Sequence, residues 1–331
     1  AYAFTLPGGP TTRQLFVVSV TDSSLTVGAG VTFRDLTLQV LGEGQAGLSN
    51  VLFDATSSRD RDFLYVTGTA VVDNCNFMGF GRTQQGVEVN YSGNLTMTAS
   101  TLRDLEYGLL TSRDCLSDVS DSSFIDSTWA VRAQGNSGVS LNTCSFTSTD
   151  AAHVMNGVDV RSTTGGLSLT VTDAAFDLGA EDGPYAFSQD AFNTSQTVAL
   201  SGSTYVGGEL GMGYRFWGNA NSLPIALAML EPVQDAYRMT GSMSVQGTGT
   251  LSIADGCVLV SNSATATRVF YVTGTAAATV GAAMFERVQL RFQDTSTGSV
   301  TGAAFTTDMN WTQVMLSIGA PGSILVDGCH F

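Results

Sequence analysis

A six-residue pattern that returns at steps of about 20 to 30 residues constrains this chain more than any other feature. The pattern is an aliphatic residue, two polar or small residues, a small residue, any residue, and then an aromatic residue or Leu. It begins at residues 48, 72, 97, 119, 141, 171, 200, 280, 300 and 326, with blurred copies at 254–259 and 33–38. A pair of helices needs about 33 residues or more per repeat, whereas one coil of a β-solenoid fits this step.

The spacing inside the pattern predicts how each copy folds. Positions four and six lie two residues apart and therefore share one face of a strand. We expect the small residues of position four to stack inward beside a ladder made by position six. Positions two and three are rich in Asn, Asp and Gly, which tolerate the left-handed backbone of a bend. The predicted aromatic ladder is Phe53, Phe77, Phe124, Phe146, Phe176, Tyr205, Phe285, Phe305 and Phe331.

The copies of the form Val72-Asp-Asn-Cys-Asn-Phe77 resemble the coil signature of β-helix repeats in the pectate-lyase-like superfamily. The resemblance covers about residues 30–331 and implies an all-β, right-handed parallel β-helix of roughly 12 coils. That superfamily contains lyases, hydrolases, phage tailspikes and adhesins. The resemblance therefore indicates a fold and leaves the function open.

The rhythm fails between Tyr205 and about residue 248, and 224–238 is the most helix-like stretch of the chain. We predict an N-terminal lead-in or cap over 1–30, a β-helix block over 31–205, an insertion with a short helix over 206–248, and a second block over 249–331. The similarity of 51–70 to 258–276 indicates a duplicated block. Because the chain stops on an inward Phe331, we expect the second block to be continued by further sequence or by a neighbouring chain.

Charge excludes several classes of partner. The net charge is −15, the pI is about 4.2, and all 14 basic residues are arginine. Nucleic acid and anionic membranes both recruit proteins through basic side chains, so neither is an expected partner. No apolar run approaches the roughly 20 residues that a spanning helix needs, so no membrane span is expected in this segment.

The residues that usually hold cofactors are scarce. There are two histidines, and the five cysteines form no CxxC pair, which argues against a zinc site or a disulfide framework. We therefore expect no cofactor and no metal, with one alternative. Calcium could bind the group Asp114, Asp118, Asp121 and Asp126, although turn chemistry already accounts for Asp121.

Four N-x-S/T sequons give candidate glycosylation sites at Asn90, Asn94, Asn193 and Asn310, and they favour a secreted chain.

One set of outward side chains is the best candidate for catalysis. In 86–90, 130–133 and 158–161 the valines are expected to point inward, which leaves Glu88, Arg132, Asp159 and Arg161 outside. Coil spacing of about 4.8 Å would place Arg132 next to Asp159. The set is either a face that binds or cleaves sugars or a cross-strand charge ladder. We favour the ladder, because the Asn90 sequon lies on the same face.

These observations favour a non-catalytic function. The main hypothesis is an extracellular structural or adhesive module of a cell surface, filament or virion, which is more consistent with this sequence than an enzyme. Its partners would be copies of itself joined end to end, other surface proteins or glycans. The alternative is a carbohydrate-active enzyme, a polysaccharide lyase or glycoside hydrolase built on the β-helix, which a cleft with acidic and aromatic residues in 206–248 would favour.

Overall fold

The computed structural model describes most of the chain, and contacts divide it into two compact units. The first unit comprises Ala1–Asp159, Leu169–Pro184 and Ser201–Glu209, and the second comprises Val160–Ser168, Tyr185–Leu200 and Leu210–Phe331. The described residues are 2–4, 17–58, 61–150, 155–161, 166–178, 187–190, 197–201, 203–206, 214–217, 225–230, 237–239, 242–261, 267–306, 315–319 and 322–331. They form β-strands and no helix, and none of them builds a helix that is long and apolar enough to cross a membrane.

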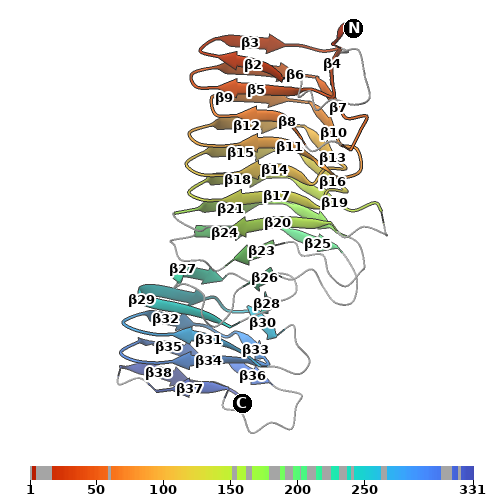
Figure 1. Cartoon of the computed structure of the whole chain (residues 1–331). Coiled ribbons are helices and arrows are strands. Elements are labelled where there is room, and N and C mark those ends of the chain that lie inside the picture. The colour runs from red at the N-terminus through yellow and green to blue at the C-terminus, as the bar shows by residue number, and fades with distance from the viewer. Residues whose placement is uncertain are drawn as a thin grey trace. The chain divides into compact units, whose positions relative to one another are not determined.

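The first unit is a stack of coils in which each coil adds one strand to each of three parallel sheets (Figure 1). Sheet A contains β1 (Tyr2–Phe4), β4 (Val31–Arg34), β7 (Leu52–Asp54), β10 (Asn76–Met78), β13 (Thr101–Arg103), β16 (Ser123–Ile125), β19 (Ser145–Thr147), β22 (Ala175–Asp177) and β25 (Thr204–Val206). Sheet B contains β2 (Val17–Thr21), β5 (Thr37–Leu41), β8 (Arg61–Val66), β11 (Gln84–Val89), β14 (Tyr107–Thr111), β17 (Trp129–Gln134) and β20 (Asn156–Arg161). Sheet C contains β3 (Ser24–Val27), β6 (Gln45–Ser49), β9 (Thr69–Asp73), β12 (Asn94–Thr98), β15 (Leu116–Ser120), β18 (Gly138–Asn142) and β21 (Ser168–Thr172).

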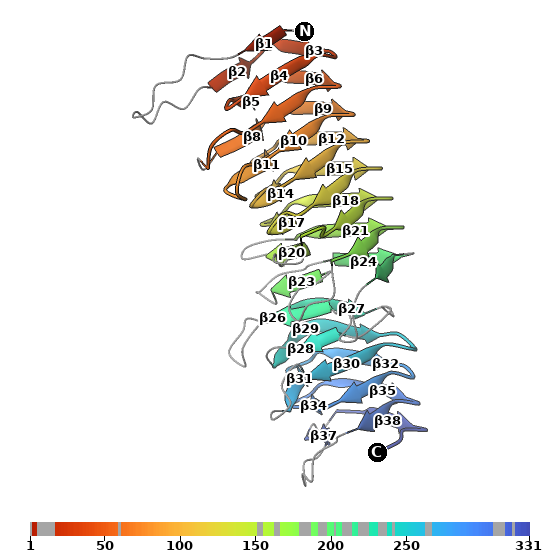
Figure 2. The same ribbon diagram turned by 90° about the vertical axis from the view of Figure 1, so that its right-hand side faces the viewer.

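The second unit is also built from stacked parallel strands (Figure 2). One stack contains β23 (Phe187–Asp190), β26 (Tyr214–Trp217), β28 (Tyr237–Met239), β30 (Val258–Ser261), β33 (Met284–Glu286) and β36 (Ala304–Thr306), and β24 (Thr197–Ser201) precedes β26 in the chain. The other, sheet D, contains β27 (Ile225–Leu230), β29 (Met243–Ile253), β31 (Arg268–Val272), β32 (Ala277–Val280), β34 (Val288–Phe292), β35 (Thr297–Thr301), β37 (Leu316–Ile318) and β38 (Ile324–Asp327).

The hexapeptide forms the turn from sheet C to sheet A in each regular coil of the first unit. Its third residue has a positive φ, between 48° and 56°, in the six copies from Asn50 to Asp173. This left-handed residue reverses the side-chain alternation, so that positions four and six both point inward. The residues with this conformation are Asn50, Asn74, Ala99, Asp121, Thr143 and Asp173.

The interior of the first unit is a column of aromatic rings beside a column of small side chains. Phe53 and Phe77 are paired in register and their ring centroids lie 4.6 Å apart, and those of Phe146 and Phe176 lie 4.4 Å apart. Leu102 takes the same place between Phe77 and Phe124. The small column is also buried and consists of Cys75, Ser100, Ser122, Cys144 and Ala174.

The second unit repeats the aromatic part of this arrangement. The ring centroids of Phe285 and Phe305 lie 4.8 Å apart, and those of Phe305 and Phe331 lie 5.3 Å apart. Tyr205, in the first unit, is paired with Phe176 in backbone register, and its side chain lies outside the described set. The prediction of an all-β parallel β-helix is confirmed.

Two details of the prediction differ from the structure. Sheet A counts about nine turns, slightly fewer than the roughly 12 coils predicted for the chain. The helix expected over 224–238 is wrong where the structure describes this stretch, because 225–230 and 237–239 are strands β27 and β28. Pro224 and Pro232 leave too few residues between them for a stable helix, and parallel pairing with β29 satisfies the backbone of β27 instead.

The domain boundaries at residues 30, 205 and 248 stay predictions.

Candidate functional site: the outer face of sheet B

The outer face of sheet B is shaped by a break in the alternation of its strands. In β11, Gly86 and Val87 are both buried, while Gln85 and Glu88 on either side of them are partly exposed. A Cβ atom on Gly86 would lie 2.5 Å from the carbonyl oxygen of Gly108, so glycine permits the close approach of these coils. Two side chains, three residues apart, therefore face outward on each of the strands β8, β11, β14 and β17.

These outward side chains form two columns across the strands. Register aligns Tyr65, Glu88, Leu110 and Arg132 in one column, and the second column contains Asp62, Gln85, Tyr107 and Trp129. Two of the predicted candidates, Glu88 and Arg132, thus share a column but are separated by the strand that carries Leu110. The structure brings together the other pair, Arg132 and Asp159, as coil spacing predicted.

Arg132 lies at the centre of a buried polar cluster. Its Nε donates to Oδ2 of Asp159 at 2.8 Å, and its Nη1 donates to Oη of Tyr107 at 2.5 Å. The guanidinium also lies 4.4 Å from the ring centroid of Tyr107 and 5.2 Å from that of Trp129, distances typical of cation–π contacts. The side chains of Arg132 and Asp159 are 11% and 1% exposed, so this is a buried ion pair and not an exposed charge ladder.

Glu88 belongs to a second cluster. Nδ2 of Asn90 donates to its Oε1 at 3.0 Å, and a side-chain hydrogen bond joins Glu88 to Asp62. A hydrogen bond between two carboxyl groups requires that one of them carry a proton. Burial raises the pKa of Glu88 above its ordinary value of 4.5, and the hydrogen bonds with Asn90 and Asp62 oppose that rise.

Tyr65 is the register neighbour of Glu88, and Tyr91 lies near Tyr65. Burial, and then the charge of Glu88, raises the pKa of Tyr65. Tyr91 is 48% exposed, and the guanidinium of Arg113 lies 4.0 Å above the centroid of its ring. Among the described residues, the sequence pattern did not single out Asp62, Tyr65, Tyr91 or Arg113. The repeating pattern makes no prediction for a polar residue at the start of a strand or for a residue in a turn.

The candidate carboxyl groups on this face are bonded to neighbouring side chains. Glu88 is bonded to Asn90 and Asp62, and Asp159 is bonded to Arg132. The fourth candidate, Arg161, lies two residues after Asp159 in the chain but is assigned to the second unit.

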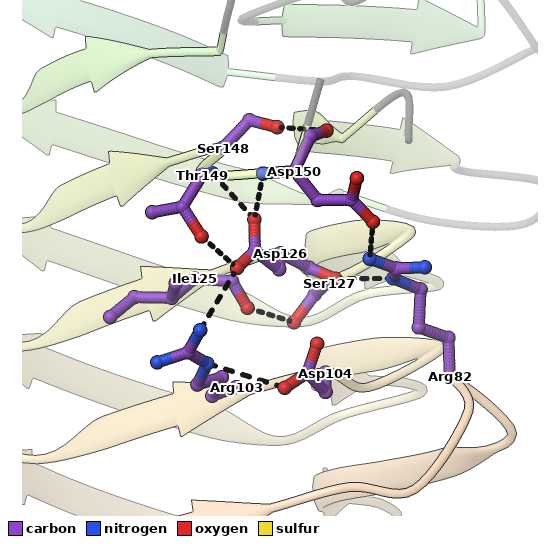
Figure 3. A network of polar contacts seen from close by, with 9 residues as sticks. All are labelled: Arg82, Arg103, Asp104, Ile125, Asp126, Ser127, Ser148, Thr149 and Asp150. Carbon is purple, nitrogen blue, oxygen red and sulfur yellow. Dashed lines mark hydrogen bonds and ion pairs between the residues drawn. The ribbon is translucent and has the colours of Figure 1, made fainter. Parts of the chain in front are cut away.

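A separate polar network fastens the turns that follow sheet A (Figure 3). The carboxylate of Asp126, which is 2% exposed, accepts hydrogen bonds from the backbone N–H groups of Thr149 at 2.6 Å and Asp150 at 3.2 Å. Arg103 contacts the same carboxylate at 3.4 Å. Arg82 donates to the carbonyl oxygen of Asp126 and pairs with the carboxylate of Asp150, both at 2.8 Å. The carboxylate of Asp126 is therefore engaged in holding these turns in place.

The four aspartates considered for calcium lie at different places on their coils. Asp118 is exposed on sheet C, Asp114 accepts a hydrogen bond from Asn136 at 2.8 Å, and Asp121 accepts one from Thr143. In the described part of the chain, no group of three or more His, Cys, Asp and Glu residues could hold a metal ion. Calcium binding by these residues stays an untested prediction.

The sequons differ in their surroundings. Asn90 is half-buried and bonded to Glu88, whereas Asn94 is exposed at the start of β12. Asn193 and Asn310 lie outside the described residues, as does His153.

The five cysteines are free thiols. Burial raises the pKa of both Cys115 and Cys144 to about 11, which keeps these thiols protonated and unreactive at neutral pH.

Comparisons with known proteins add little to this geometry. No protein-family model matches the chain, and no curated protein matches it. A search of solved structures finds the catalytic unit of the thermostable GH87 α-1,3-glucanase from Streptomyces thermodiastaticus strain HF3-3, with 12% identity and a TM-score of 0.31. The match covers 95% of this chain and spans 63% of that one.

Proposed function

We propose that this chain is a non-catalytic, extracellular structural or adhesive module that binds glycans on the outer face of sheet B. The observation that carries the proposal is the arrangement of Tyr107 and Trp129 against a buried Arg132–Asp159 pair. Aromatic side chains with a polar group at one end suit sugar surfaces, which are apolar on one side and hydroxylated at the edges. The buried pair keeps its charges out of solvent and orders the rings before any ligand arrives.

Order of this kind favours binding. A side chain that is already immobile loses little conformational entropy when a ligand contacts it. Arg132 contacts both rings, and its own position is set by two hydrogen bonds. The neighbouring cluster of Glu88, Asp62 and Asn90 adds hydrogen-bonding groups that can accept from or donate to sugar hydroxyls.

The alternative function is a glycoside hydrolase, and one observation favours it. Burial raises the pKa of Glu88, and a raised carboxyl pKa is a common property of general acids. In that hypothesis Asp62 would have to separate from Glu88 when substrate binds, because the two carboxyl groups now share a hydrogen bond.

The two functions are separated by one pair of measurements. Affinity electrophoresis against neutral and acidic polysaccharides should show retardation of the chain, and incubation with the same polymers, with and without calcium, should release neither reducing ends nor unsaturated products. Trp129→Ala should abolish the retardation. As a matched control, Phe80→Ala removes an aromatic side chain, 51% exposed, from the turn after sheet A and should leave it unchanged. Turnover that disappears with Glu88→Gln would replace the proposal by the hydrolase.

The same proposal places the chain on a cell, filament or virion surface, with copies of itself or other surface proteins as further partners. It is supported by the acidic, Ser- and Thr-rich composition and by the exposed Asn94 sequon. Protein isolated from its natural source should lose mass on enzymatic deglycosylation. Light scattering of the same material should show particles larger than the monomer.

A further inference from the structure

The second unit carries an arginine and a tyrosine side by side on the outer side of the adjacent strands β31 and β34 (Figure 1). Buried residues precede and follow both Tyr271 and Arg291 along their strands, so these two side chains point outward. They are paired in register, and the guanidinium of Arg291 lies 5.6 Å from the ring centroid of Tyr271. Gln289 is the preceding outward position of β34, and Ser317 of β37 is the register neighbour of Arg291. We call Tyr271, Gln289, Arg291 and Ser317 the arginine face.

A buried amide fixes the position of Arg291. Gln289 is 7% exposed, and its Oε1 accepts a hydrogen bond from Nη2 of Arg291 at 2.9 Å. In the first unit Asp159 holds Arg132 in a comparable way, but as a carboxylate it also neutralises the guanidinium. Gln289 carries no charge. It therefore orients Arg291 and leaves the positive charge uncompensated.

Other side chains do not compensate this charge either. Among the residues that the structure describes, no Asp or Glu forms an ion pair with Arg291, and its Nε is buried without an acceptor. Arg291 as a whole is partly exposed, so a ligand can reach its guanidinium. Five other described arginines do have a carboxylate partner, namely Arg34, Arg82, Arg103, Arg132 and Arg287. In a chain with 29 acidic residues, an arginine that is oriented but unpaired indicates a site for a carboxylate from outside.

The corresponding place in the first unit carries the opposite charge. Tyr65 and Tyr271 both begin the sequence Tyr-Val-Thr-Gly-Thr-Ala. One coil further on, the register neighbour of Tyr65 is Glu88, and that of Tyr271 is Arg291. The solenoid accepts either charge at this place, so the coil itself does not require an arginine there.

We propose that the arginine face binds a glycan through a single carboxylate of an acidic sugar. A guanidinium presents its N–H groups in a planar fork that matches the two oxygens of a carboxylate. The ring of Tyr271 can pack on the apolar side of the same sugar, and the hydroxyl of Ser317 can bond to its edge. A polyanion suits the face less well, because the net charge of −15 repels it. This site lies in another unit than the site on sheet B and does not depend on it.

The test measures how the full chain binds fluorescent oligosaccharides, at physiological ionic strength, in pairs that differ by an acidic sugar. One pair is lactose and lactose that ends in sialic acid, and the other is cellobiose and cellobiouronic acid. At least one acidic member should bind about tenfold or more tightly than its neutral match, and the pair that shows this identifies the kind of sugar.

Three variants test the role of the guanidinium. Arg291→Gln should abolish the preference for the acidic sugar. Gln289→Glu should do the same while it keeps Arg291 in place, because it supplies the carboxylate that the site lacks. Arg291→Lys keeps the charge but loses the planar fork, and it should recover little of the binding.

Two further variants are controls. Arg34→Gln removes an arginine that is 48% exposed, in β4 of the first unit, and should bind like the parent. Trp129→Ala, which tests the site on sheet B, should also keep the preference, so failure of one site can be told from failure of the other. All variants should melt within a few degrees of the parent by circular dichroism. The proposal would be overturned by equal binding of acidic and neutral members, by a preference that survives Arg291→Gln, or by an equal loss in Arg34→Gln.

Discussion

Within the first unit, the interior beneath sheet A and the outer face of sheet B use the coil in opposite ways. Beneath sheet A, one register position holds Phe53, Phe77, Phe124 and Phe146, with Leu102 between the second and third. On sheet B, one register position holds Tyr65, Glu88, Leu110 and Arg132. The interior column holds the same kind of residue in nearly every coil. The outer column holds a different kind of residue in each coil.

This difference separates the information for the fold from the information for the site. A column of like residues gains stability from every adjacent pair, so the solenoid is specified many times over. A column of unlike residues has no such repetition. Each of its contacts depends on one particular partner in the next coil. Loss of one interior ring should therefore cost packing alone, whereas loss of one outer residue should change how its neighbours are charged or placed.

The largest effect should come from the interior. Phe124→Ala removes a ring with no exposed surface, stacked 5.1 Å from Phe146, and should lower the free energy of unfolding by about 3–5 kcal/mol through lost burial and a cavity. Urea denaturation would measure it, with Phe80→Ala as an exposed control that changes little. A loss below about 1 kcal/mol would mean that the column is not the source of stability that we infer.

The buried ion pair should rank second. Asp159→Asn leaves the guanidinium of Arg132 without its carboxylate, and we expect a loss of about 2–4 kcal/mol. The range is lower than for the ring because Arg132 keeps its hydrogen bond to Tyr107. The double variant Arg132→Met, Asp159→Leu should recover part of the loss, since neither charge then remains buried. A double variant that is less stable than Asp159→Asn would contradict this account.

A smaller effect should follow from Cys144→Ser. The small column already holds serine in the two coils that precede Cys144, and Oγ of Ser122 donates to the carbonyl oxygen of Ser120 at 2.8 Å. A serine at 144 can make the equivalent bond to the carbonyl oxygen of Asn142, which Sγ now contacts at 3.5 Å. We expect a loss of about 1 kcal/mol or less in the same denaturation assay. A loss as large as that of Phe124→Ala would mean that the thiol has a special role.

The smallest effect should be a change in pH dependence at the outer face. The folded pKa of Glu88 lies above its unfolded value, so its contribution to stability is complete below the unfolded pKa and is lost as pH rises through the folded pKa. Glu88→Gln removes this titration. The variant should therefore lose less stability with rising pH than the parent does, as measured by urea denaturation from pH 4 to pH 8. Parallel curves for the two proteins would show that Glu88 is not perturbed.

The repeating features of the solenoid could be predicted from the sequence. The features that depend on a single contact between two side chains could not. The Val72–Phe77 spacing gave the bend and the inward ladder, and coil spacing gave the approach of Arg132 to Asp159. The burial of that pair was not predictable, because it depends on Tyr107, 25 residues before Arg132 in the chain. Nor was the pairing of Asp62 with Glu88, since the two inward residues Gly86 and Val87 break the alternation on which the prediction relied.

The hydrogen bonds of Arg82 affect how this solenoid unfolds. In an ideal solenoid each coil touches only the next, so unfolding can start at either end and advance one coil at a time. Arg82 follows β10, yet it is bonded to Asp126 after β16 and to Asp150 after β19, which lie 44 and 68 residues further along the chain. Its side chain spans the intervening coil and is bonded to two later coils. These coils should therefore unfold together. Hydrogen exchange across 76–150 should therefore follow one cooperative opening event and not a graded series of them.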